Sequence, residues 1–382
     1  MNKETLTIVQ LLSSSLGGAA EHVYNLVTST EDTSINYKLV SPDDGGHIIE
    51  DFQAKGFPVE IINVAQGFSL KTLWGLVKFI RGSQAQIVHC HGFRAGLFGR
   101  VAARLASPKI KTILTVHGFH YMHYQNRLKR IVFLLLERIL TRITDFVIAV
   151  SDTDLNNLLR LKCAKINKSI RIFNGIDVPK ICSLKIDKTL KKQELGVSSD
   201  AKYVIGTVAR LRPEKGVGYF LKAIPEIIRL CPHCFFLIVG DGEQRTEFKI
   251  LVEKLGLENK VAFLGNRSDV LEILRILDVF VFPSLWEGLP IAPMEAMAVG
   301  VPVVATDVSG NRDLIGSNGG NGLLVPTKNP EAITRAVLRL LTEDKLAEKL
   351  IASAKEQISE KFTVRIMTDK TVQQYKNIIQ SH

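Results

Sequence analysis

The stretch VFVFPSLWEGLPIAPMEAMAVGVPVVATD, residues 279–307, decides the fold that the sequence predicts. It begins with an apolar run of strand-forming residues at 279–282, and a second apolar run follows at 301–305. A loop and a short helix at 293–299 separate the two runs, and Gly300 ends the helix. This order of strand, loop, helix and strand predicts one unit of an α/β protein with a parallel sheet.

Two carboxylates lie close together in this stretch. Glu287 is in the loop, and Glu295 is expected in the first turn of the helix, with Gly288 between them. The first N–H groups of a helix are unpaired and bind anions, so acids beside them suit a ligand with hydroxyls next to phosphates, such as a nucleotide-sugar. The alternative is ordinary helix-end electrostatics and a simple turn, and the two residues alone leave both open.

Length and composition indicate a two-domain protein. The chain has 382 residues, enough for two domains with their own cores, and its 46% of hydrophobic residues argues against disorder. Five cysteines without a secretory leader favour a reducing compartment, so we expect a cytoplasmic protein. Cys231 and Cys234 form one close pair with no second pair beside it, which favours structural thiols over a metal or redox site.

The net charge of +11 predicts an anionic partner. No nucleic-acid-binding motif is present, and no apolar run approaches the roughly 20 residues that span a bilayer. Anionic lipid headgroups and a phosphorylated substrate therefore remain as partners.

The first half of the chain alternates predicted strands and helices. A strand at 5–12 leads into the Gly17-Gly18 turn and a helix at 19–28, a layout that brings backbone N–H groups near a phosphate but matches neither the G-x-G-x-x-G nor the Walker A motif. A plain tight turn is the alternative. Further strands are expected at 37–41, 58–62, 85–91, 111–116 and 146–151, with helices at 70–81 and 92–105. In parallel sheets ligands bind beyond the carboxyl ends of strands, where Gly17, His91 and His117 would lie.

One predicted helix of the first half, within 117–146, is both basic and amphipathic. Its apolar residues at helical spacing are Leu128, Ile131, Val132, Leu135, Leu136 and Ile139, and its basic residues are Arg127, Lys129, Arg130, Arg138 and Arg142. The pattern is typical of a helix on a membrane surface. A core-packed helix with a solvated basic face is the alternative, and this segment alone slightly favours it.

The alternation restarts after a Lys-rich segment at 178–201, which we interpret as an interdomain connection with one short helix near Gln193. Strands are expected at 203–208, 235–239 and 261–264, with a helix at 218–229. Arg210, Lys215 and Asn266 follow strands of this second sheet. The two cations are suited to neutralising a diphosphate, although surface ion pairs remain an alternative.

The ordered set of motifs resembles the retaining glycosyltransferases of the GT-B fold, family 4, which includes many bacterial polysaccharide enzymes. The motifs that carry the resemblance are Gly17-Gly18, His117-Gly118, Asn174-Gly175 with Asp177, Gly206 to Arg210 with Lys215-Gly216, Val239 to Gly242, Phe263 to Gly265, the pair Glu287 and Glu295, and Asn321 to Val325. One departure is visible at Ser309 to Asp313, where the family often has Gly-Gly followed by Glu.

The resemblance implies two Rossmann-like parallel-sheet domains that face each other across a cleft. Residues 1–177 would form an acceptor-binding domain completed by a C-terminal helix at about 362–382, residues 178–201 a linker, and residues 202–361 a domain that binds the nucleotide-sugar donor. It also implies transfer with retention, from what we expect to be a UDP-sugar to a glycan or lipid-linked acceptor, in cell-envelope or exopolysaccharide biosynthesis.

The resemblance further assigns roles to individual residues. The residues expected to act in catalysis are His117, Arg210, Lys215 and Glu287. The residues expected to bind the donor are Gly17, Gly18, Arg210, Lys215, Asn266, Arg267, Glu287, Gly288, Leu289 and Glu295. No metal and no cofactor are expected, because a D-x-D motif is missing and the two cations would stabilise the leaving diphosphate.

Two other functions fit a chain of this general fold. One is a nucleotide-sugar epimerase, and the other is a non-catalytic nucleotide-sugar-binding subunit. We also expect that the helix at 127–142 holds the protein on an anionic membrane surface, on its cytoplasmic face, and that nucleic acid is not a partner.

Overall fold

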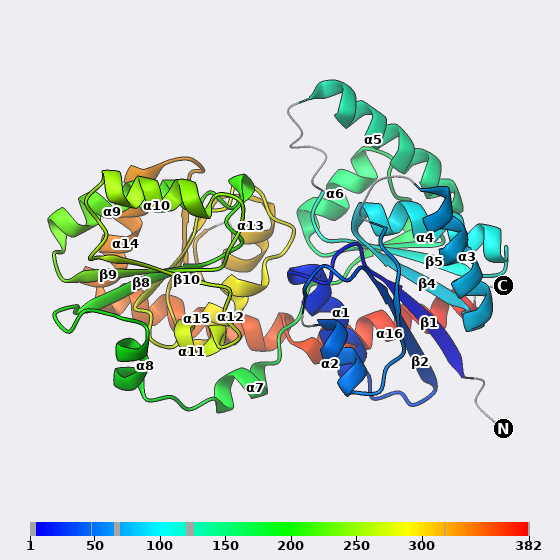
Figure 1. Cartoon of the computed structure of the whole chain (residues 1–382), viewed down its shortest axis with the longest axis horizontal. Helices are drawn as coiled ribbons and strands as arrows, with labels where there is room; N and C mark the ends of the chain where they lie inside the picture. Colours follow the sequence, from blue (N-terminus) through cyan, green and yellow to red (C-terminus); the bar gives the residue numbers. More distant parts are fainter. Residues whose placement is uncertain (1–4, 47, 65–68, 120–125, 317, 381–382) are drawn as a thin grey trace. The chain divides into compact units, whose positions relative to one another are not determined.

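The computed structural model describes residues 5–46, 48–64, 69–119, 126–316 and 318–380. It divides the chain into two compact units, one made of residues 1–175 with 364–382 and the other of residues 176–363. Each unit is built on a single parallel sheet with flanking helices (Figure 1). The expected α/β class with two Rossmann-like sheets is therefore confirmed.

The first unit has a seven-stranded sheet in the order β3-β2-β1-β4-β5-β6-β7. Its strands are β1 (Leu6–Leu11), β2 (Ile35–Ser41), β3 (Val59–Ile61), β4 (Ile87–His91), β5 (Lys111–Val116), β6 (Phe146–Ala149) and β7 (Ser169–Arg171). Its helices are α1 (Gly18–Thr28), α2 (Ile48–Ala54), α3 (Leu70–Ser83), α4 (Gly92–Ala106), α5 (Arg127–Leu140), α6 (Asp152–Arg160) and α16 (Val364–Gln380).

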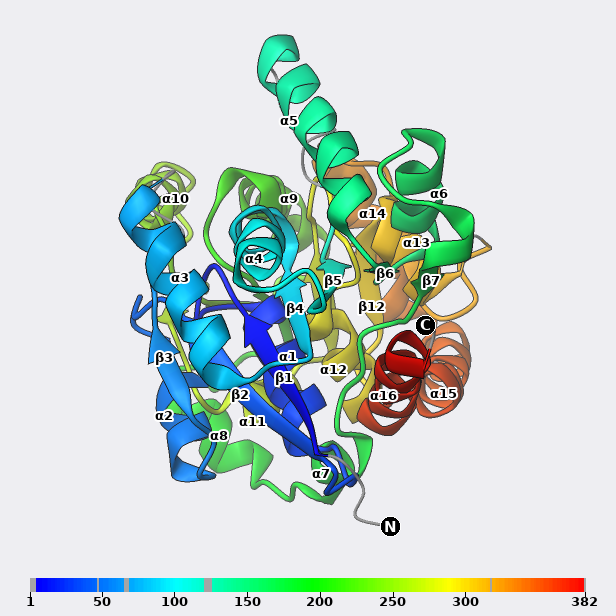
Figure 2. The same cartoon turned by 90° about the vertical axis from the view of Figure 1, so that its right-hand side faces the viewer.

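Both faces of this first sheet are buried. Ile8 of β1 packs into one core with α1, α2 and α16, while its neighbour Val9 packs into another with α3, α4 and α6 (Figure 2). Successive side chains of a strand point to opposite faces, so a strand covered on both sides is mostly apolar. This is why β1, β5 and β6 are largely apolar in the sequence, with buried polar side chains such as Gln10 and Thr115 as exceptions.

The second unit has a six-stranded sheet in the order β10-β9-β8-β11-β12-β13. Its strands are β8 (Tyr203–Val208), β9 (Cys234–Val239), β10 (Val261–Gly265), β11 (Val279–Phe282), β12 (Val303–Thr306) and β13 (Leu323–Val325). Its helices are α7 (Val178–Ser183), α8 (Lys188–Glu194), α9 (Val217–Leu230), α10 (Arg245–Lys254), α11 (Val270–Leu274), α12 (Ile291–Val299), α13 (Ser309–Ile315), α14 (Pro330–Thr342) and α15 (Asp344–Lys361).

The stretch that predicts the fold forms β11, α12 and β12, with one correction. Helix α12 begins at Ile291, two residues earlier than expected. Pro293 does not mark the helix start, because proline is tolerated anywhere in a first turn, where the N–H groups have no partner within the helix. Glu295 therefore lies in the second turn of α12, and the expectation that it lies in the first turn is wrong.

The segment 178–201 differs from the expected connection with one short helix. It contains two helices, capped by Asp177 and Asp187, and it belongs to the second unit. Lys191 of α8 anchors the segment, since its ammonium pairs with three carboxylates, those of Asp269, Glu194 and Glu272. A Lys-rich sequence predicts an exposed linker, because lysines are usually solvated. Lys191 is instead almost fully buried in the structure.

Candidate active site

The second unit brings two of the predicted site residues into direct contact. The Lys215 ammonium lies 2.5 Å from Glu287 Oε1, and the two side chains are only 17% and 10% exposed. The short 3₁₀ turn Pro213–Lys215 ends at Gly216, whose φ of 61° places it in the left-handed region. A side chain at Gly216 would put its Cβ 2.1 Å from the carbonyl oxygen of Pro283. Glycine thus allows the Lys215 turn to lie against the Glu287 loop.

The Glu287 loop is also held from the other side. The Ser309 hydroxyl donates a hydrogen bond to the Glu287 carbonyl, at 2.6 Å, and a Cβ on Gly310 would lie 1.7 Å from the Gly288 carbonyl oxygen. Ser309 and Gly310 begin α13. The turn where this chain departs from the usual family sequence is therefore packed directly on the predicted donor-binding loop.

Four more of the predicted donor residues lie in this unit, at or after the carboxyl ends of its strands. Arg210 follows β8 and is exposed, near the carboxylates of Glu214 and Glu287. Glu295 of α12 is half-buried, whereas Gly288 and Leu289 are buried.

Two further predicted donor residues follow β10. Asn266 is exposed. The Arg267 guanidinium pairs with the carboxylates of Asp269 and Glu194, so it links β10 to α8. A role for these two residues in binding the base stays a prediction.

In the first unit, the Gly17-Gly18 turn leads into α1 as predicted. Gly17 has a φ of 83°, and its carbonyl accepts hydrogen bonds from the amides of Ala20 and Glu21. Asp44 fixes the preceding loop, since it accepts from the Ser15 amide at 2.8 Å and from the Ser14 hydroxyl at 2.7 Å. Burial raises the pKa of Asp44, but the hydrogen bonds from the two serines outweigh it, so the net shift is downward.

His117 lies in a cluster of three histidines of the first unit. It follows β5, next to His91 at the end of β4 and His22 of α1. His91 Nδ1 is 3.1 Å from His117 Nε2, and the rings of His22 and His117 meet edge to face at 4.8 Å. One ring nitrogen from each histidine lies within 4.8 Å of the others. The strand-end rule indicated His91 and His117, but His22 comes from a helix and carried no sequence signal.

A hydrogen-bond network fixes the outer nitrogens of two of these rings. His91 Nε2 lies 2.8 Å from Gln10 Oε1, and His22 Nδ1 lies 2.9 Å from Asn174 Oδ1. An amide oxygen only accepts hydrogen bonds, so these two nitrogens carry the protons. Burial lowers the pKa of His22 to about 4, against the opposing effect of Asn174, and burial also holds the pKa of His91 well below its ordinary value.

The network continues to the C-terminal helix. Gln10 Nε2 donates to the Tyr375 hydroxyl at 3.0 Å, and this hydroxyl is 2.6 Å from His89 Nδ1. His89 Nε2 is 2.6 Å from Thr115 Oγ1. Helix α16 thereby reaches from the end of the chain to the histidines at the carboxyl edge of the first sheet.

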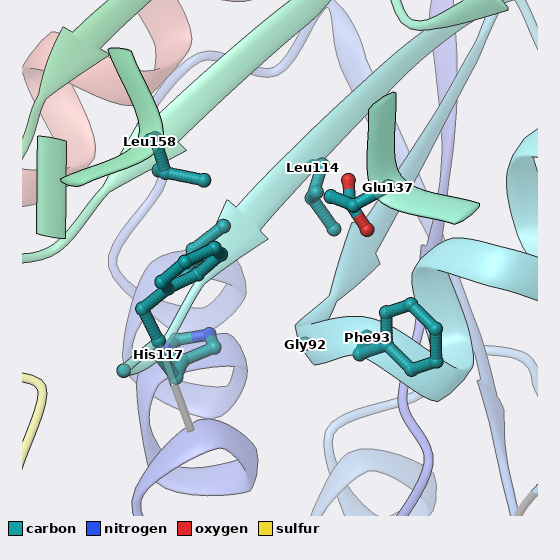
Figure 3. A pocket seen from close by; sticks show the side chains of 9 residues that line it. Gly92, Phe93, Leu114, His117, Glu137 and Leu158 are labelled. Carbon is teal, nitrogen blue, oxygen red and sulfur yellow. The ribbon is translucent and has the colours of Figure 1, made fainter. Parts of the chain in front are cut away.

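A cavity of about 30 Å³ lies beside His117 (Figure 3). It is lined by Gly92, Phe93, Leu114, Val116, His117, Gly118, Phe119, Glu137 and Leu158. One water molecule needs about 10–15 Å³ of such volume, so the cavity holds about two water molecules. The cavity is therefore too small for a sugar.

Helix α5 presents five of the six residues of its predicted apolar stripe to solvent, and the sixth, Leu136, is half-buried. Leu128, Ile131, Val132, Leu135 and Ile139 are 46–70% exposed. A different face of the helix, with Phe133 and Leu134, packs on the core, and Glu137 and Leu140 are buried. The alternative of a helix that buries this stripe in the core is therefore wrong. Within the part of the chain that the structure describes, no helix is both long and apolar enough to cross a membrane.

Known proteins match both halves of the chain. The family model "Glycosyltransferase Family 4" matches residues 16–180, and "Glycosyl transferases group 1" matches residues 187–357. The Escherichia coli enzyme UDP-Gal:alpha-D-GlcNAc-diphosphoundecaprenol alpha-1,3-galactosyltransferase is 31% identical over 320 residues, which are 83% of this chain and 82% of that protein. The N-acetyl-alpha-D-glucosaminyl L-malate synthase of Bacillus anthracis is 28% identical over 296 residues, 76% of this chain and 74% of that one.

Among solved structures, Anabaena HepE in complex with UDP-glucose is similar in fold. The TM-score is 0.84 at 21% sequence identity, and the match covers 97% of this chain and 100% of that one. Two Rossmann-like sheets in one chain give the GT-B fold, and the two family models and the Escherichia coli relative show that the chain is a glycosyltransferase. The chain belongs to glycosyltransferase family 4.

Proposed function

We propose that this glycosyltransferase moves a sugar from a UDP-sugar to a glycan or lipid-linked acceptor, with retention of the anomeric configuration, in cell-envelope or exopolysaccharide biosynthesis. The contact between Lys215 and Glu287 is the observation that carries the proposal. The relatives support it, since the Escherichia coli enzyme is named for a UDP-galactose donor and a diphosphoundecaprenol-linked acceptor, and HepE binds UDP-glucose.

The second unit binds the donor in this proposal. Lys215 and Arg210 bind the diphosphate, while Glu287 accepts hydrogen bonds from hydroxyls of the sugar and Glu295 from those of the ribose. Lys215 and Glu287 neutralise each other at 2.5 Å in the structure. Donor binding exchanges this contact for one between Lys215 and phosphate and one between Glu287 and sugar, so neither charge is left buried and unpaired.

The transfer step is a substitution on one face of the sugar. The bond from the anomeric carbon to the diphosphate oxygen breaks, and the bond to the acceptor oxygen forms on the same face. The leaving diphosphate takes the proton of the acceptor hydroxyl. Arg210 and Lys215 stabilise the charge that develops on the diphosphate, the task that a metal ion performs in other transferases. His117 contacts the transferred sugar near the reacting carbon.

Helix α5 binds an anionic membrane surface in this proposal. Its exposed apolar stripe lies on the same helix as Arg127, Lys129 and Arg130 at its first turns. An apolar stripe inserts into the boundary between headgroups and acyl chains, and each cation near an anionic leaflet contributes about 1 kcal/mol. A lipid-linked acceptor would be presented at such a surface.

The proposal is tested by incubating the purified protein with a panel of UDP-sugars, with and without GlcNAc-diphosphoundecaprenol. We expect release of UDP that depends on the acceptor, and a product whose anomeric configuration by NMR equals that of the donor. Conversion of one UDP-sugar into another without acceptor would instead show an epimerase. Failure of UDP and of every UDP-sugar to raise the melting temperature would contradict the donor class.

A further inference from the structure

We propose that His22, His91 and His117 form a binding site for a borderline transition-metal ion such as Zn²⁺, and that a metal bound there inhibits sugar transfer. The metal is an inhibitor and not a cofactor in this proposal. Metal binding stands on the geometry of the first unit alone, whereas inhibition rests also on the proposed role of His117.

The first argument is the spacing of the three rings. Nitrogens bound to one zinc ion at 2.0–2.1 Å in a tetrahedral arrangement lie about 3.3 Å apart. His91 Nδ1 and His117 Nε2 are already 3.1 Å apart, and a nitrogen of His22 completes a set within 4.8 Å. One pair of nitrogens therefore already has the spacing that a single ion requires, and the third nitrogen lies within 4.8 Å of both.

The second argument is the direction of the lone pairs. Gln10 and Asn174 each accept a hydrogen bond from the outer nitrogen of one ring, which leaves the lone pairs on His91 Nδ1 and His22 Nε2. The His91 Nδ1 lone pair accepts a hydrogen bond from His117 Nε2, so a metal takes the place of that proton, and neutral His117 then carries its proton on Nδ1. Metal-bound histidines usually donate their other N–H to an oxygen in this way, which fixes the tautomer and orients the ring. Both outer-shell partners are thus in place before any metal arrives.

The third argument is the chemistry of the donors. Three neutral imidazoles suit Zn²⁺, Cu²⁺, Ni²⁺ and Co²⁺, whereas Mg²⁺ and Ca²⁺ prefer oxygen ligands. Three protein ligands leave a fourth position for water. His22 and His91 are buried, but His117 is half-buried, so the cluster is closed on two sides and borders less buried surroundings at His117.

Inhibition follows from the position of His117. A metal bound to its ring nitrogen holds the imidazole against His22 and His91 and occupies the nitrogen that would contact the sugar. The bound ion also adds positive charge at a residue proposed to lie near the anomeric carbon, where the transition state itself develops positive charge. Both effects lower the transfer rate.

Metal binding is measured first, without any substrate. The EDTA-treated and dialysed protein is titrated with Co²⁺, whose visible absorption reports its coordination, and the bound Co²⁺ is then displaced with Zn²⁺. We expect one site per chain that gives the spectrum of four-coordinate cobalt. The variants H22Q and H117Q should each weaken binding at least tenfold, while H233Q, at an exposed histidine of the second unit, should not change it.

A variant of the outer shell separates ligation from general folding. Asn174→Leu removes the acceptor for His22 but keeps all three imidazoles, and loss of such a partner costs about 10–100-fold in metal affinity. Circular dichroism verifies that each variant is folded. If the cobalt spectrum and affinity are unchanged in folded H22Q and H117Q, the three histidines are not the site and the proposal is overturned.

Inhibition is measured next, with the donor and acceptor found to be active. We expect Zn²⁺ to inhibit the wild type, EDTA to reverse the inhibition, and Mg²⁺ at the same concentration to have no effect. H22Q should keep activity and lose sensitivity to zinc. Zinc binding without inhibition would overturn only the second half of the proposal, and an inactive wild type would count against the proposed function while leaving metal binding standing.

Discussion

At the scale of single residues, the two cations of the second unit carry the chemistry that we propose. Arg210→Ala and Lys215→Ala should each lower the turnover number by about 10²–10³-fold at saturating donor, because each removes one contact to the charge that develops on the leaving diphosphate. Lys222→Ala is the matched control, since Lys222 is exposed on α9 of the same unit. Near-wild-type turnover of both variants would remove these residues from the mechanism.

The same cations lead to a prediction about metal ions. In our proposal Arg210 and Lys215 take the place of a metal at the diphosphate, so excess EDTA should not lower the rate of transfer, and added magnesium or manganese should not raise it. The measurement is UDP release in the three conditions. Loss of turnover with EDTA that either metal restores would show that a divalent ion is required.

Ser309 is a residue whose importance only the structure reveals. Its hydroxyl donates to the Glu287 carbonyl, so Ser309→Ala should loosen the donor-binding loop by about 1 kcal/mol, or about fivefold in kcat/KM for the donor. Ser353→Ala, at another half-buried serine of the unit, is the comparison. An unchanged kcat/KM would mean that the Gly310 contact alone holds the loop.

The sequence predicted site residues where a local rule places them. Gly17, His117 and Lys215 follow strands, and ligands of parallel sheets bind at strand ends. The contacts of His22 and Ser309 could not be predicted from the sequence, because these residues reach their partners only through tertiary packing. No spacing rule connects a helix residue at position 22 with strand ends at positions 91 and 117.

At the scale of elements, α5 shows why periodicity alone could not decide which face is buried. The helix has apolar residues over most of its circumference, and a buried ion pair fixes its orientation. The guanidinium of Arg100 in α4 donates to both carboxylate oxygens of Glu137, at 2.7 and 3.0 Å, and to the Gly96 carbonyl. Charged residues normally indicate the solvated face of a helix, so the sequence predicts that the face with Glu137 is exposed, whereas this face is buried.

Glu137→Gln tests this ion pair. The substitution leaves the fully buried Arg100 without a counterion, and loss of one partner of a buried pair costs about 3–5 kcal/mol of the free energy of unfolding. Glu50→Gln on the exposed face of α2 is the control, expected within about 0.5 kcal/mol. Hydrogen exchange of α4 and α5 peptides during urea unfolding reports the first unit separately from the second. An unchanged exchange rate in α5 would show that apolar packing alone holds the helix.

At the scale of the whole molecule, the class of fold was predictable because strands and helices alternate twice along the chain. Buried parallel strands such as β8 and β11 read as short apolar runs, and glycines after them mark the turns. The extent of each unit was harder to predict. α7 and α8 have weak apolar patterns. A salt-bridge cluster around Lys191 holds α8, and the Arg275 guanidinium donates to the Ile181 carbonyl of α7, and no pattern of hydrophobic residues can show either contact.

The charge of the whole chain leads to the last prediction, which concerns association with membranes. With a net charge of +11 and the exposed stripe of α5, the 382-residue chain should sediment with vesicles that contain phosphatidylglycerol and much less with phosphatidylcholine vesicles. Replacing Arg127, Lys129 and Arg130 together by glutamate should abolish the difference, because three or more cations near the leaflet contribute about 1 kcal/mol each.

Salt and a second variant separate the two forces in this association. Raising the ionic strength from 0.15 M to 1 M shortens the Debye length from about 8 Å to about 3 Å, so binding should fall steeply if charge dominates. The double variant with Leu128→Ser and Ile131→Ser removes apolar contact without changing charge, and it should weaken binding at every salt concentration.

A matched variant controls for the change in net charge. It carries glutamate in place of Lys345, Lys349 and Lys355, all on α15. If this control loses vesicle binding as completely as the α5 variant does, the total charge of the chain attracts it to the membrane and α5 is not the docking element.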